Sequence, residues 1–176
     1  MSVLFAVLFC SALVGLDQLF KFLAIEYLKP IEYIDVINKV LRFRYVENTG
    51  AVFGSFATQT VLLTVFSVVL LVFTIVFLIK NKDKSKFVNV CLLLMIAGGI
   101  GNIIDRIRLK YVVDFIEPLF VDFAVFNFAD CLITVGAFAL IGYLIVDIFK
   151  DVKKSPKRMV ASDKTDTDSS DSNGTD

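Results

Sequence analysis

The stretch VLLTVFSVVLLVFTIVFLI, residues 61 to 79, indicates the class of fold, because it contains no charged side chain over its whole length. An α-helix of about 20 apolar residues is long enough to cross the hydrocarbon core of a bilayer. The composition of the whole chain agrees, since 57% of its 176 residues are hydrophobic and its mean hydropathy is +0.77. The sequence therefore predicts a membrane protein.

Apolar runs of suitable length lie at about residues 3–25, 58–79, 87–107 and 125–148. They predict an all-α membrane protein with four transmembrane helices, which together form one membrane domain over residues 1–155. Residues 156–176 are acidic and of low complexity, so we expect a disordered tail there. An even number of spans places both ends of the chain on the same side of the membrane.

Basic residues predict the side on which those ends lie. The connector KNKDKSK, residues 80–86, and the stretch KDVKKSPKR, residues 150–158, are both dense in lysine and arginine. Loops of this kind remain in the cytoplasm. We therefore expect both termini and the acidic tail to be cytoplasmic, and the loop over residues 26–57 to lie outside the membrane.

The outer loop has the sequence pattern of strands. In VLRFRYVENTG, residues 40–50, apolar and aromatic residues alternate with arginines, and YIDVI, residues 33–37, is also rich in β-forming residues. The sequence predicts a small extracytoplasmic β-rich loop that connects the first two spans.

Acidic residues near the outer ends of the spans are the candidates for chemistry. Asp17 and Lys21 are four residues apart on one helix face, where they can form an ion pair. Asp130 is the only charged residue from Phe123 to Val146, and burying it in a membrane helix costs about 2.5 to 3.5 kcal/mol. A second carboxylate close to Asp130 would explain its presence, because two such groups can share one proton and act as general acid and general base.

Physical reasoning leaves the second carboxylate open, since Asp17, Asp105 and Asp114 all lie toward the same side of the membrane. The chain has no histidine, which excludes Ser-His and Cys-His nucleophile pairs and histidine-ligated zinc. Two other classes of protein also fit intramembrane carboxylates. One is a small transporter or channel subunit, although we find neither an internal repeat nor polar groups at the midplane. The other is a structural or assembly protein, in which Asp114 and Asp130 would have no role.

Five motifs taken together resemble the signal peptidase II family, the lipoprotein signal peptidases of bacteria, which are intramembrane aspartyl proteases. The motifs are LDQLFK at 16–21, ENTGAVFG at 47–54, GGIGNIIDR at 98–106, VVDF at 112–115 and FNFAD at 126–130. The resemblance implies an enzyme of the bacterial cytoplasmic membrane that cuts the signal peptide from prolipoproteins, just before the cysteine that carries a diacylglyceryl group. It implies membrane lipid and the lipidated substrate as partners, a monomer, and neither a cofactor, a metal nor a nucleic acid.

The resemblance also implies roles for individual residues. Asp114 and Asp130 match the catalytic pair of the family. The positions that match residues lining the pocket, holding the substrate or supporting the site are Asn48, Asn102, Asp105, Arg106, Asn127, Asp17 and Lys21. The active site is then expected at the outer face of the membrane.

Overall fold

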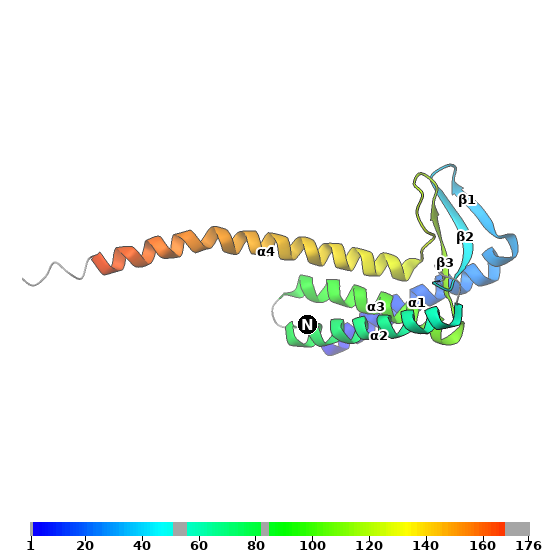
Figure 1. The fold of residues 1–176 in the computed structure, drawn as a ribbon, viewed down its shortest axis with the longest axis horizontal. Coiled ribbons are helices and arrows are strands. Elements are labelled where there is room, and N and C mark those ends of the chain that lie inside the picture. The colour runs from blue at the N-terminus through cyan, green and yellow to red at the C-terminus, as the bar shows by residue number, and fades with distance from the viewer. Residues whose placement is uncertain (1, 51–55, 82–84, 168–176) are drawn as a thin grey trace, which may run out of the picture. The chain divides into compact units, whose positions relative to one another are not determined.

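The computed structural model describes residues 2–50, 56–81 and 85–167, and the chain divides after Ala139 into two compact units. Its elements in chain order (Figure 1) are α1 (Val3–Leu23), the π-helix η1 (Ala24–Leu28), the 3-10 helix η2 (Lys29–Ile31), β1 (Tyr33–Ile37), β2 (Leu41–Asn48), α2 (Phe56–Asn81), α3 (Lys86–Arg108), β3 (Val112–Pro118) and α4 (Phe128–Thr167). Residues 51–55, part of one of the motifs quoted above, lie outside the described residues.

The four predicted spans are confirmed as helices. Segments long and apolar enough to cross a membrane cover Val3–Ile31, Thr60–Lys80, Lys86–Arg108 and Phe128–Lys150. In α3, 61% of the most apolar stretch is buried inside the protein, whereas in α2 none of the most apolar stretch is buried. Because α1 and α2 both pack on α3, we take α3 as the central helix of the first unit. Most apolar side chains of α2 are exposed, as is expected of a helix that contacts lipid.

Two predicted helix ends differ from the structure. The first span does not end near residue 25 but continues through η1 and η2 to Ile31, and Glu32, with φ at 65°, then turns the chain. The fourth begins at Phe128 rather than 125, because Phe126 exchanges backbone hydrogen bonds with Ile116 and so extends the sheet. The length of an apolar run therefore overestimates the length of the helix when a residue just before the helix pairs with a strand.

The three strands form one antiparallel sheet in the order β1-β2-β3 (Figure 1). The two strands expected in the outer loop are present as β1 and β2. The third strand, β3, contains the VVDF motif and was not predicted from the sequence. A bulge between Phe43 and Val46 sets the register of β2 against β3 and pairs Val46 with Asp114.

Glycines allow α1, α3 and the first turns of α4 to approach closely. A side chain at Gly101 would collide with the Asp17 carboxylate, and one at Gly98 would collide with the Ala129 carbonyl. A Cβ added at Gly136 would lie 2.6 Å from the carbonyl oxygen of Cys91. These approaches bring the start of α4 against the middle of α3.

The second unit, Leu140–Asp176, contains the rest of α4. The helix extends to Thr167 and so includes residues 156–167, the first part of the segment whose composition predicts a disordered tail. Residues 168–176 lie outside the described part of the chain.

Candidate active site

Asp114 and Asp130, called the carboxylate pair below, come from β3 and from the first turn of α4 and are linked by two amides. Asn127 donates from Nδ2 to Asp114 Oδ1 across 2.6 Å, and Asn102 donates from Nδ2 to Asp130 Oδ1 across 2.8 Å. The two amides also meet each other, since Asn127 Nδ2 lies 3.2 Å from Asn102 Oδ1. Four residues from three elements thus form one continuous hydrogen-bond network.

Asp114 is almost completely buried, with 1% of its surface exposed, and two amides donate to it. Besides Asn127, Asn48 donates from Nδ2 to Asp114 Oδ2 across 2.8 Å. The Asn48 amide is oriented by Gly50, whose N–H donates to Asn48 Oδ1. Gly50 has φ at 72°, a conformation that glycine adopts without strain.

Burial raises the pKa of Asp114 to about 6. The hydrogen bonds from Asn48 and Asn127 oppose this shift, because they stabilise the charged form. The negative charge of Asp130 adds to the rise, while the positive charge of Lys21 reduces it. Asp114 therefore holds a proton to higher pH than an ordinary aspartate does, which suits a general acid.

Asp130 is fixed by a reciprocal cap at the start of α4. Asn127 Oδ1 accepts the N–H of Asp130 across 3.0 Å, and Asp130 Oδ2 accepts the N–H of Asn127 across 3.2 Å. This exchange is a capping box, in which the N-cap residue and the residue three positions later satisfy each other's backbone N–H. The spacing N-x-x-D in FNFAD is the sequence signal for such a cap.

The ion pair between Asp17 and Lys21 is present and has a third member. Lys21 Nζ lies 3.0 Å from Asp17 Oδ2 and 2.9 Å from Asp105 Oδ2, and only 2% of the lysine side chain is exposed. Lys21 also donates to Asn102 Oδ1 across 2.9 Å. Of the three candidates for the partner of Asp130, Asp17 and Asp105 thus face Lys21, and Asp114 shares the amide network with Asp130.

Arg106 and Gln18 complete the polar surroundings. The Arg106 guanidinium donates to Ser67 Oγ across 3.5 Å, and its charge interacts with Asp130 and Asp114. Gln18 was not predicted, although it stands next to Asp17 inside an apolar span. Its Nε2 donates to Asp105 Oδ1 across 3.0 Å.

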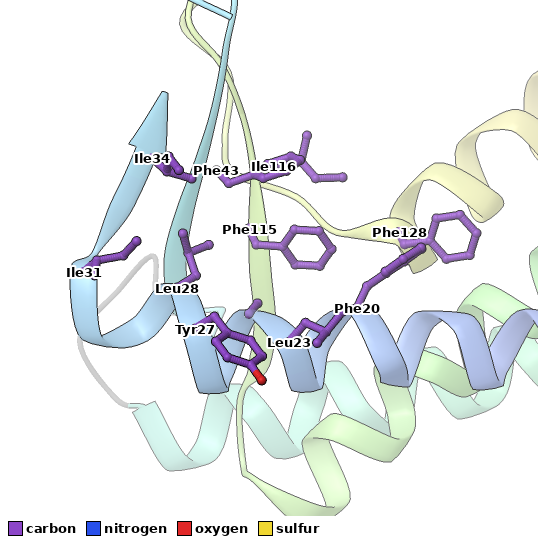
Figure 2. A pocket seen from close by; sticks show the side chains of 11 residues that line it. Phe20, Leu23, Tyr27, Leu28, Ile31, Ile34, Phe43, Phe115, Ile116 and Phe128 are labelled. Atoms are coloured by element: carbon purple, nitrogen blue, oxygen red, sulfur yellow. The ribbon is translucent and has the colours of Figure 1, made fainter. Parts of the chain in front are cut away.

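Residues next to the carboxylate pair in the sequence help to line an apolar groove of about 550 Å³ (Figure 2). Figure 2 shows side chains from the end of α1, η1, η2, all three strands and the start of α4 lining it. Phe115 and Ile116 directly follow Asp114 in β3, and Phe128 lies two residues before Asp130. The groove has almost no polar lining, so it suits a hydrocarbon chain better than a peptide.

Among the described residues, no group of three or more His, Cys, Asp or Glu side chains could hold a metal ion. The chemical groups that the site offers are the two carboxylates, three asparagine amides and one arginine. Such a site can bind a water molecule and transfer protons to and from an extended peptide.

Several known proteins resemble this chain in sequence and in fold. A family model described as signal peptidase (SPase) II matches residues 9–146. A lipoprotein signal peptidase of Caldanaerobacter subterraneus subsp. tengcongensis is 44% identical over 141 residues, which cover 80% of this chain and 95% of that protein. A lipoprotein signal peptidase of Enterococcus faecalis is 39% identical over 140 residues, covering 80% of this chain and 87% of the other.

A solved structure of a bacterial membrane enzyme, obtained by the in meso method at 1.9 Å resolution, has a TM-score of 0.74 and 29% identity to this chain. The match covers 81% of this chain and 93% of that one. Sequence and fold therefore agree, and the chain belongs to the signal peptidase II family.

Proposed function

We propose that Asp114 and Asp130 are the catalytic pair with which this aspartic endopeptidase removes signal peptides from prolipoproteins, by hydrolysing the bond before the diacylglyceryl-modified cysteine. The observation that carries the proposal is the pair of amides that links the two carboxylates, Asn127 on Asp114 and Asn102 on Asp130. Of the acids near the site, Asp17 and Asp105 are both ion-paired with Lys21, so they are poorly suited to proton transfer.

In the proposed mechanism the pair shares one proton, which Asp114 carries at the start. Asp130 accepts a proton from water as the water oxygen bonds to the scissile carbonyl carbon, and Asp114 gives its proton to the carbonyl oxygen. The carbon–nitrogen bond of the resulting diol then breaks. Asp130 passes its proton to the leaving amine, and a hydroxyl proton returns to Asp114. No covalent intermediate forms, and the cycle needs neither a metal nor a cofactor.

The apolar groove provides a place for the lipid part of the substrate. The diacylglyceryl group is attached to the residue that follows the scissile bond, so its chains must lie close to the carboxylate pair. Phe115, Ile116 and Phe128 line the groove (Figure 2), and each stands one or two residues from Asp114 or Asp130 in the sequence. One acyl chain in the groove would favour the modified cysteine over an unmodified one through apolar burial.

The four apolar helices and the bacterial relatives support a protein of the bacterial inner membrane. The lysine-rich segments 80–86 and 150–158 support an orientation with both termini in the cytoplasm. The three-stranded sheet and the carboxylate pair are then at the outer face, where signal peptides are cut. We also propose that residues 1–155 are sufficient for activity as a monomer. The family relationship does not favour a transporter or channel subunit.

Hydrolysis of a diacylglyceryl lipopeptide by the purified protein in detergent tests the proposal. We expect Asp114→Asn and Asp130→Asn each to lower kcat by about 10² to 10⁴, the usual contribution of a general acid or base. The matched control is Asp122→Asn, at an exposed aspartate in the loop between β3 and α4, which should retain wild-type activity.

Melting temperatures measured in the same detergent show whether each variant is folded. Full activity in either substituted pair member would remove that residue from the mechanism. A folded wild-type protein that leaves the lipopeptide intact would refute the peptidase proposal altogether.

A further inference from the structure

Lys21 is almost completely buried near the carboxylate pair. Among the described residues it forms neither an ion pair nor a hydrogen bond with Asp114 or Asp130. Its ammonium has three partners, which are the carboxylates of Asp17 and Asp105 and the side-chain oxygen of Asn102. A buried cation with two carboxylates is costly to assemble unless its geometry is good and its partners are satisfied. The further contacts of those partners indicate what the arrangement does.

Each carboxylate on Lys21 also holds the backbone residue just before one member of the pair. Asp105 Oδ2 accepts the N–H of Val113 across 3.2 Å, and Val113 precedes Asp114. Asp17 Oδ1 accepts the N–H of Ala129 across 3.0 Å, and Ala129 precedes Asp130. Val113 and Ala129 are themselves completely buried, so these N–H groups have no access to water.

The third contact of Lys21 determines the orientation of an amide. An ammonium group only donates hydrogen bonds, so the atom of Asn102 that faces it must be the oxygen. The Asn102 nitrogen is thereby directed to Asp130, to which it donates. Lys21 thus acts on the pair by three routes, through the backbone of β3, through the backbone of α4 and through Asn102.

We propose that Lys21 is a positioning residue that sets the separation and orientation of Asp114 and Asp130, by holding Asp17, Asp105 and Asn102 at fixed distances from one ammonium group. The inference rests on the proposed function of the pair. It predicts that weakening this cluster lowers kcat while leaving KM nearly unchanged, because the reacting groups move and the substrate contacts do not.

The safest test of the cluster is at Asp105. Asp105→Ala leaves Lys21 and Asp17 as a neutral pair, so folding should survive, but it releases Val113 and hence β3. We expect kcat to fall by about 10- to 100-fold at nearly constant KM. Asp105→Asn keeps an oxygen that can accept the Val113 N–H, so it should recover part of kcat and retain measurable turnover.

Lys21 itself is tested in two backgrounds. Lys21→Met leaves two carboxylates buried without a cation and should lower both the melting temperature and kcat. The triple variant Asp17→Asn, Lys21→Met, Asp105→Asn removes all three charges, so we expect its melting temperature to recover toward wild type while kcat remains low. Lys29→Met is the matched control, because Lys29 forms an exposed ion pair with Glu47, and its kcat should be unchanged.

The results for these variants distinguish a positioning role of Lys21 from a purely structural one. A triple variant that regains both stability and wild-type kcat would show that Lys21 is only structural, and so would Asp105→Ala with unchanged kcat. If Lys21→Met or the triple variant cannot be purified in a folded form, the comparison of Asp105→Ala with Asp105→Asn decides alone. Activity in Asp114→Asn would instead refute the proposed pair, so the two failures are distinguishable.

Discussion

At the scale of single residues, the two carboxylates of the pair have different environments. Asp114 is buried on a strand, with an amide on each oxygen, whereas Asp130 belongs to a helix cap. The Asp114 environment favours the protonated form, since burial is the largest influence on its pKa. Different surroundings for chemically identical groups are how a site separates a general acid from a general base.

A pH profile tests this difference. With a pKa of about 6, Asp114 in the free enzyme loses its proton as the pH rises through that value, so kcat/KM should fall on the alkaline side. Asn48→Ala removes a donor that stabilises the Asp114 carboxylate, which raises the pKa further. We therefore expect the alkaline limb of its profile to move to higher pH, whatever the loss in overall rate. A limb that stays in place or moves to lower pH would contradict the assignment of the proton to Asp114.

Single residues also show how far the sequence could predict the site. Asp130 could be identified because it is an isolated charge in an apolar run. Physical reasoning could not select its partner, which only the family resemblance implied, because Asp17, Asp105 and Asp114 lie on three different elements and the packing of those elements decides which one meets it. Lys21 is the reason, since it attracts two of the three and leaves Asp114 for the amide network.

At the scale of elements, the helices were predictable and the third strand was not. Apolar length alone identifies a membrane helix, because unpaired backbone groups are not tolerated in lipid. The segment VVDFIEP carries the same β-branched residues as a strand, but its place in the sheet depends on hydrogen bonds to β2, far away in the sequence. Local pattern gave β1 and β2, which are neighbours in the chain, and missed the strand that carries Asp114.

The contact between α3 and α4 gives a prediction about helix packing. Gly136→Ala places a methyl group against the Cys91 carbonyl and the side chains of Met95 and Leu94. We expect a lower melting temperature in detergent, corresponding to about 1 to 3 kcal/mol of overpacking. Gly15→Ala is the control, since nothing lies within 4 Å of an added Cβ there, and it should not be destabilising. Equal melting temperatures for both variants would argue against the described packing of α4.

The apolar groove gives a second prediction at this scale. Ile34 in β1 lines the groove, whereas Ile37 in the same strand is similarly exposed and does not. Ile34→Asn should raise KM for a long-chain diacylglyceryl lipopeptide by about fourfold to tenfold, since each methylene contact is worth about 0.8 kcal/mol. The same peptide with acetyl chains should be unaffected, and Ile37→Asn should behave as wild type with both. An equal change in KM for both peptides would place the acyl chain elsewhere.

At the scale of the whole molecule, the proposed orientation follows from the distribution of lysine and arginine and can be tested without measuring activity. In a background without native cysteines, Lys39→Cys in the turn between β1 and β2 should react with a membrane-impermeant maleimide in intact cells. Lys80→Cys, at the end of α2, should react only after the membrane is permeabilised. The opposite labelling pattern would invert the topology and place the sheet and the carboxylate pair in the cytoplasm.

The reciprocal cap between Asn127 and Asp130 has a consequence for the range of leader sequences that the enzyme accepts. If Asp130 reacts as proposed, it needs no contribution from an incoming chain to reach its working arrangement, because Asn127 already holds it. Differences in sequence among signal peptides would then be accommodated by the groove and the sheet, and the carboxylate pair would not have to move. One rigid centre can in this way serve many different precursors, provided that each presents the same lipid and an extended backbone.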